Sequence, residues 1–189
     1  PIYPNVTIRP EVEKAMKELD RRGILQSIAS KNEHSIAMDK IKELGIEEYF
    51  LYPQINWGTK SVSVDKIAKS INIGIDTLAF IDDQAFEREE VSFVLPQVLC
   101  LDALDVDKML DMKEFNPKFI TDDSAKRRKM YLADIARKEI EESFEGPQDS
   151  FLSTLDMILT IGKPQAEDLK RGEELTMRTN QLNTTGYTY

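Results

Sequence analysis

The sequence predicts an α/β fold with a parallel sheet flanked by helices. Over residues 1–115, short apolar runs alternate with amphipathic stretches of about ten to thirteen residues. Such alternation is typical of βαβ units, whose right-handed crossovers bring the loops that follow the strands to one edge of the sheet. Near residue 116 this alternation ends, and a long charged stretch follows. We therefore expect a core domain over 1–115, and a helical linker with part of a second α/β domain over 116–189.

Local patterns define the individual elements. Helices are expected where apolar residues recur every three or four positions, and strands where short apolar runs occur. In the core, the expected helices cover about residues 10–22, 30–44, 59–71 and 84–93, and the expected strands cover 24–29, 49–55, 77–83 and 97–101. In the second part, we expect helices over about 122–144, 151–155 and 164–176, and a strand over 157–161.

Composition is that of an ordinary globular protein and excludes several classes of function. The 189 residues carry a formal net charge of −9, which argues against non-specific binding to nucleic acids. One cysteine excludes an internal disulfide framework and fits a reducing, cytoplasmic location. No apolar run approaches the ~20 residues of a membrane span and no signal-peptide pattern opens the sequence, so no membrane partner is expected. The first and last residues read as cut ends, and we expect a longer protein.

Two adjacent carboxylates end the expected strand over 77–83. Asp82 and Asp83 follow five apolar or small residues. Like charges at a buried strand end repel each other unless a cation neutralises them, and open α/β sheets bind ligands at the carboxyl ends of parallel strands. Magnesium prefers oxygen ligands and often bridges carboxylates to a phosphate, so it is the expected metal. The alternative is that Asp83 caps the helix that begins near Gln84.

A hydroxyl group ends the expected strand over 24–29. Ser30 and Glu33 match the Ser-x-x-Glu capping box, and on this segment alone helix capping is the favoured interpretation. The alternative places the Ser30 hydroxyl, with Lys31, Asn32 and the following backbone amides, around an anionic oxygen at a helix N-terminus.

A lysine stands at the start of the third expected helix. The helix dipole disfavours Lys60 in this first turn by a few tenths to ~1 kcal/mol. A phosphate between the helix end and the ammonium would convert this penalty into attraction. A strand-end hydroxyl, a helix-start lysine and paired strand-end carboxylates together predict a site for a phosphate and a divalent metal.

The same order of residues resembles motifs two to four of the haloacid dehalogenase (HAD) superfamily, which are a Ser or Thr ending a strand, a Lys, and a strand ending in acidic residues. More narrowly, the sequence resembles the FkbH-like branch in Ala29-Ser-Lys-Asn32, Ile55-Asn-Trp-x-x-Lys60 and Phe80-Ile-Asp-Asp-x-x-x-Glu-Arg-Glu89. The downstream Arg178-Thr-Asn-Gln-Leu-Asn183, followed by Thr184 and Thr185, is similar to that branch too. The resemblance therefore covers most of the chain.

This resemblance implies a Rossmann-like HAD core followed by an N-acyltransferase-like region. It implies a magnesium-dependent enzyme that dephosphorylates a glycolytic acyl phosphate, bisphosphoglycerate, and loads the glyceryl unit onto an acyl carrier protein in polyketide or related biosynthesis. On this sequence, Ser30 and Lys60 would be catalytic residues that hold the transferring phosphate. Asp82 would ligate magnesium, and Asp83 would assist directly or through water.

One motif of the superfamily is missing from this sequence. The superfamily's nucleophilic aspartate lies in an Asp-x-Asp-x-Thr pattern on the first strand, whereas Asp65, Asp76 and Asp102 stand at other positions. We therefore expect no nucleophile within residues 1–189, no turnover by these residues alone, and an upstream segment that supplies the aspartate. A plain small-molecule phosphatase and a catalytically silent scaffold or interaction module are the alternatives.

Some further residues carry weaker expectations. The single histidine, His34, leaves no Ser-His-Asp triad or multi-histidine metal site and is expected at the surface. Cys100 is expected to be a small buried apolar residue, and Trp57 could line the pocket or pack against other apolar side chains. A basic cluster is expected to be a solvated helix face, with docking of an acidic acyl carrier protein as the sharper hypothesis. The cluster comprises Lys126, Arg127, Arg128 and Lys129.

Overall fold

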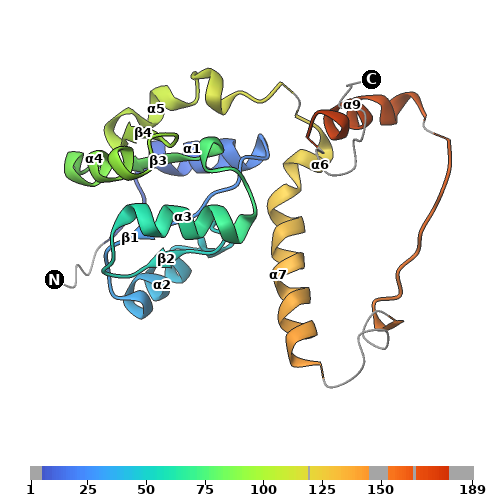
Figure 1. The fold of residues 1–189 in the computed structure, drawn as a ribbon, viewed down its shortest axis with the longest axis horizontal. Helices are drawn as coiled ribbons and strands as arrows, with labels where there is room; N and C mark the ends of the chain where they lie inside the picture. Colours follow the sequence, from blue (N-terminus) through green and yellow to red (C-terminus); the bar gives the residue numbers. More distant parts are fainter. Residues whose placement is uncertain (1–5, 119, 145–152, 164, 179–189) are drawn as a thin grey trace.

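The computed structural model describes residues 6–118, 120–144, 153–163 and 165–178, and it has a mixed α/β fold (Figure 1). Two pairs of strands form, both parallel. β1 (Ala29–Ser30) pairs with β2 (Gln54–Ile55), and β3 (Ala79–Asp82) pairs with β4 (Leu99–Asp102). The predicted parallel pairing is confirmed. Among the described strands it is divided between two small sheets, and β1 and β3 do not join them through backbone hydrogen bonds.

The core helices are α1 (Pro10–Arg21), α2 (His34–Glu43), α3 (Lys60–Ile71) and α4 (Ala85–Val94), followed by the short α5 (Val106–Met109). Three of them confirm the predicted bounds closely, whereas α2 begins at His34 rather than Ser30 and α5 was not predicted. The strands are shorter than predicted, in part because the 3₁₀ turns η1 (Glu47–Tyr49) and η2 (Ile75–Thr77) each take in the first residue of a predicted strand. Two further 3₁₀ turns, η3 (Ala103–Asp105) and η4 (Lys113–Phe115), follow β4.

Helices cover both faces of the β3–β4 sheet, as buried parallel strands require. On one face, Ala79 and Ile81 pack against a cluster from α1, α5 and η4. On the other face, Phe80 packs with Val64 of α3 and Val91 of α4. Successive β3 side chains therefore alternate between two apolar layers, and the strand carries Asp82 out of them at its carboxyl end.

The second part begins with α6 (Asp122–Ala125), continues into α7 (Arg127–Ser143), and ends in η5 (Ala166–Asp168) and α9 (Leu169–Arg178). Figure 1 shows α7 running beside the core, with α9 returning to the level of α6. The predicted helix over 122–144 is confirmed with a break at Lys126, and the predicted helix over 164–176 is confirmed from Ala166 onward. Residues 145–152 lie outside the described residues, which leaves 153–155 of the predicted helix over 151–155; Ser153 and Thr154 are helical and Leu155 is in a turn.

The predicted strand over 157–161 is wrong. This segment has no regular secondary structure, and its four apolar side chains are exposed, namely Met157, Ile158, Leu159 and Ile161. A strand is stable only when its backbone groups pair with a neighbouring strand. In the described part of the second unit there is no such neighbour.

The basic cluster does not form a solvated face, contrary to the prediction. Only Lys126 and Lys129 are exposed. Arg127 donates to the carbonyl of Gly23 over 2.6 Å, and Arg128 is buried, with two bonds to the Asp20 carboxylate and an ion pair to Glu48. These contacts attach the start of α7 to the core, so the cluster as a whole is not available to a carrier protein.

A glycine allows this attachment. Gly23 ends the turn after α1 with a φ of 73°, in the left-handed region that favours glycine. A Cβ atom there would lie 2.2 Å from the backbone oxygen of Ser124, which is a clash. Thr121 and Ser124 form the capping box of α6, and Ser124 is buried against this turn.

Candidate functional site

Lys60 lies between the ends of β1 and β3. As the first residue of α3 it is buried, and its Nζ donates to the Ala29 carbonyl oxygen over 2.6 Å and to Asp82 Oδ2 over 3.1 Å. Its ammonium is 5.8 Å from the centre of the Phe80 ring, within the range of a cation–π contact. The predicted convergence of these strand ends is confirmed for Lys60 and Asp82.

Asp82 is fixed by several donors, whereas Asp83 is exposed. The Oδ1 atom of Asp82 accepts from the backbone N–H of Gln84 over 2.9 Å, and Oδ2 accepts from Lys60. Gln84, not Asp83, is the N-cap residue of α4, so the helix-capping alternative for Asp83 is wrong. Within the described residues, the Asp83 carboxylate makes no hydrogen bond or ion pair.

The acidic pair fits a magnesium ion that shares its ligands with a substrate. Magnesium is usually held by one or two carboxylates, several waters and substrate phosphate oxygens. Asp82 and Asp83 would provide the carboxylates. In the part of the chain that the structure describes, no three His, Cys, Asp or Glu side chains gather as a metal site, so these residues do not form an all-protein cage.

Ser30 does not cap a helix, and the favoured interpretation of its segment was wrong. Ser30 is the last residue of β1, and its carbonyl accepts from the Asn56 backbone over 3.0 Å. α2 starts only at His34, after N-cap Glu33, whose backbone N–H donates to Asn32 Oδ1. Pairing of β1 with β2 therefore prevails over the local capping pattern. The Ser30 hydroxyl has no partner among the described residues, which leaves it available to a ligand.

Lys31 is engaged by a residue that the sequence interpretation did not select. Its Nζ lies 2.5 Å from Oε1 of Glu87 in the first turn of α4, and the Glu87 side chain is only 8% exposed. Glu87 Oε2 is buried and has no partner among the described atoms. A carboxylate in a first helical turn is favoured by the dipole, but the sequence gives no sign of its distant lysine partner. This pair links the end of β1 to α4, in addition to the link that Lys60 makes between β1 and β3.

The N-terminus of α3 already holds an anionic group. Both the backbone N–H and the hydroxyl of Ser61 donate to the carboxylate of Glu90 on α4, the former over 3.0 Å. Glu90 therefore compensates the helix dipole beside Lys60. A phosphate placed between the helix end and the ammonium, as predicted, would compete with this carboxylate. Among the described residues, donors that remain for a phosphate include the Lys60 ammonium and the Ser30 hydroxyl.

Three residues outside the predicted site occupy the following positions. His34 is exposed on α2, as predicted. Cys100 is partly buried in β4, and burial raises the pKa of its thiol, which agrees with a packing role. Trp57 does not pack in the core, since it is 72% exposed on the loop between β2 and α3.

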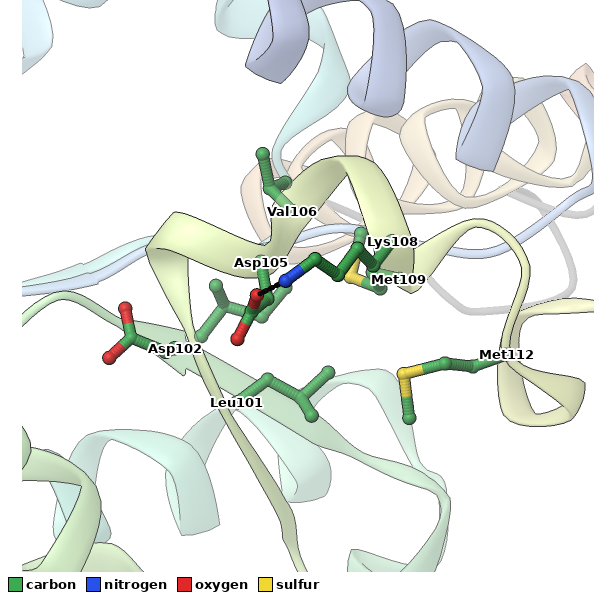
Figure 2. Close-up of a pocket in the computed structure, with 8 residues that line it drawn as sticks. Leu101, Asp102, Asp105, Val106, Lys108, Met109 and Met112 are labelled. Atoms are coloured by element: carbon green, nitrogen blue, oxygen red, sulfur yellow. Dashed lines mark hydrogen bonds and ion pairs between the residues drawn. The ribbon is translucent and has the colours of Figure 1, made fainter.

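A cavity lies beside the β3–β4 strand ends, where Ile81 and Asp102 line it. Figure 2 shows this cavity of about 260 Å³ between the β3–β4 sheet and α5. Its walls include Leu101, Met109 and Met112. Lys108 and Asp105, which form an ion pair, also line the cavity. No residue predicted to bind phosphate or metal lines it, so it belongs to the packing of α5 on the sheet.

Comparison with known proteins adds no further identification. No family model, no curated protein and no solved structure matches the chain. None of the helices in the described ranges is long and apolar enough to cross a membrane.

Proposed function

We propose that this chain carries the phosphate- and magnesium-binding side of a HAD-type site, which handles a phosphorylated three-carbon acyl donor for transfer to an acyl carrier protein. The observation that carries the proposal is the Lys60 ammonium, which is shared between the end of β1 and Asp82 at the end of β3. A buried cation beside paired strand-end carboxylates is the arrangement that phosphate chemistry with a metal needs.

Each residue has a chemical role in this proposal. Asp82 and Asp83 would hold magnesium, which when bound neutralises charge on the phosphate oxygens. Lys60 donates to a phosphate oxygen, and the Ser30 hydroxyl, which is free of protein partners among the described residues, donates to another. Lys31, paired with Glu87, borders the site and supports β1 rather than contacting the phosphate directly.

Charge balance predicts that metal and phosphate bind together. As ionised groups, Lys60 contributes one positive charge, and Asp82 and Asp83 contribute one negative charge each. A phosphate dianion would enter a site that is already negative, whereas bound magnesium makes the site positive first. Phosphate affinity should therefore depend strongly on magnesium.

Calorimetric titration of residues 1–189 with bisphosphoglycerate, with and without magnesium chloride, tests this proposal. We expect binding only with magnesium, and loss of that binding in Asp82→Asn. The matched control is Asp65→Asn, which removes an exposed carboxylate on α3 that pairs with Lys69. The proposal would be overturned if the parent protein and Asp82→Asn bound bisphosphoglycerate equally, or if binding did not depend on magnesium.

The transfer step separates the candidate functions. Since the sequence contains no Asp-x-Asp-x-Thr pattern, the proposal assigns the nucleophile to a segment outside residues 1–189. The same observation favours a second candidate, a silent binding module. Protein that includes an Asp-x-Asp-x-Thr segment is incubated with magnesium, bisphosphoglycerate and a carrier protein, and the mass of the carrier is measured. A gain of one glyceryl unit supports transfer, phosphate release alone supports a phosphatase, and neither supports the module.

A further inference from the structure

We infer that Arg88 is a positioning residue that sets the geometry between the two acidic side chains of the candidate metal site. The inference rests on the proposed function, because it concerns how Asp82 and Asp83 present their carboxylates to a divalent cation. Arg88 touches neither carboxylate of the pair. It acts through the backbone that carries them.

Arg88 joins the ends of two neighbouring strands. Its Nη1 donates to the backbone carbonyl of Asp82 over 2.7 Å, and its Nη2 lies 2.7 Å from Oδ2 of Asp102. Asp82 and Asp102 are register partners at the ends of β3 and β4. The other oxygen of Asp102 accepts from the Leu104 backbone over 2.9 Å, so the carboxylate that holds Arg88 is itself fixed. The Arg88 side chain is 20% exposed, which limits competition from water.

The bonded carbonyl belongs to the peptide unit that links Asp82 to Asp83. That unit is planar, so a donor that fixes its oxygen also fixes the tilt of the plane and the direction of the Asp83 Cα atom. Lys60 and the Gln84 N–H separately fix the Asp82 carboxylate. Arg88 therefore fixes the backbone from which the second carboxylate projects, relative to the first.

This arrangement predicts a specific order of effects on metal affinity. Loss of a residue that orients a metal ligand typically weakens binding by 10–100-fold, and here we expect about tenfold in Arg88→Gln. Arg88→Lys keeps a cation that cannot reach both partners with the same fork geometry, and should fall between the parent and Arg88→Gln. Asp102→Asn leaves the Asp82 carbonyl bonded but loosens the guanidinium, and should weaken binding less than Arg88→Gln.

The test is a titration of residues 1–189 and these variants with Mn²⁺, a paramagnetic stand-in for magnesium, followed by water-proton relaxation. Urea unfolding of each variant is measured in parallel. A merely structural Arg88 would lower the unfolding midpoint and leave the Mn²⁺ Kd within twofold of the parent, which overturns the inference. If Arg88→Gln does not fold, the Mn²⁺ Kd of Arg88→Lys is the test, and a value within twofold of the parent again overturns the inference.

Failure of the inference is distinguishable from failure of the proposed function. Binding that Asp82→Asn loses and Arg88→Gln keeps overturns the role of Arg88 alone. A parent protein that binds no Mn²⁺, or binds it equally as Asp82→Asn, overturns the metal site and the inference with it. A weaker Kd in Arg88→Gln, with Arg88→Lys in between, supports both.

Discussion

Replacing Arg128 should detach α7 from the core. The Arg128 side chain is 8% exposed, and its guanidinium makes two bonds to the Asp20 carboxylate, of 2.7 and 3.2 Å. It also contacts the Glu48 carboxylate over 2.8 Å and lies 4.6 Å from the centre of the Tyr49 ring. In Arg128→Met the apolar stem is retained, and these polar contacts are lost together.

The size of the effect follows from the exposure of each partner. Removing one member of a buried pair costs about 3–5 kcal/mol, but Asp20 is 20% exposed and water will relieve part of this penalty. Glu48 is 61% exposed, so its ion pair adds ~0–1 kcal/mol, and the ring contact adds a similar amount. We therefore expect Arg128→Met to lower the free energy of unfolding by ~2–4 kcal/mol, and Arg128→Lys to lower it by roughly half as much.

Urea unfolding monitored by circular dichroism measures this loss, and trypsin cleavage within α7 reports detachment of the helix. Lys129→Met is the matched control, since Lys129 is an exposed neighbour in the same basic cluster and should change stability by less than ~0.5 kcal/mol. If Arg128→Met were as stable and as resistant to trypsin as Lys129→Met, the reasoning from burial and bidentate pairing would be refuted.

Three further predictions concern the site and the titratable groups. Lys60→Met leaves the Asp82 carboxylate, whose side chain is 11% exposed, without its cation. We expect the free energy of unfolding in urea to fall by ~2–4 kcal/mol, and an unchanged unfolding midpoint would contradict the importance of this buried pair. Hydrogen bonds from Arg21 and then Arg22 lower the pKa of Glu18 from 4.5 to about 2. Because the folded pKa is depressed, this stabilisation is present above about pH 4.5 and is lost as the pH falls toward 2. Glu18→Gln should therefore lower the free energy of unfolding near neutral pH and flatten the acid-unfolding profile between about pH 4.5 and 2. Burial raises the pKa of the Cys100 thiol, so iodoacetamide at pH 8 should modify it more slowly than a free cysteine until urea unfolds the protein, and equal rates would contradict this.

Local patterns in the sequence were sufficient for the helices and for the order of the strands. Periodic apolar positions placed α1, α3 and α4 within one or two residues of their observed bounds. The convergence of Lys60 and Asp82 was also predictable, because parallel βαβ units bring successive strand ends to one edge. Both inferences depend on features that repeat within a short window or follow from a general rule of topology.

Contacts between distant residues were not predictable from one sequence. The basic cluster reads as a solvated face because nothing near Arg128 indicates that its partners, Asp20 and Glu48, lie 108 and 80 positions earlier. Ser30 reads as a capping residue because the pattern is local, whereas pairing of β1 with β2 is not. The segment over 157–161 has strand propensity, but propensity is effective only against a neighbouring strand.

The candidate site itself lies where backbone pairing stops. β1 and β3 are not hydrogen-bonded to each other in the described structure, and side chains bridge them instead. Lys60 joins the Ala29 carbonyl to Asp82, and Lys31 joins the end of β1 to Glu87 on α4. A backbone ladder would fix this separation regardless of charge, whereas two ammonium–carboxylate bridges hold it by electrostatic attraction. A bound anion or cation changes that attraction directly, so ligand charge and the spacing of the strand ends are coupled in this arrangement.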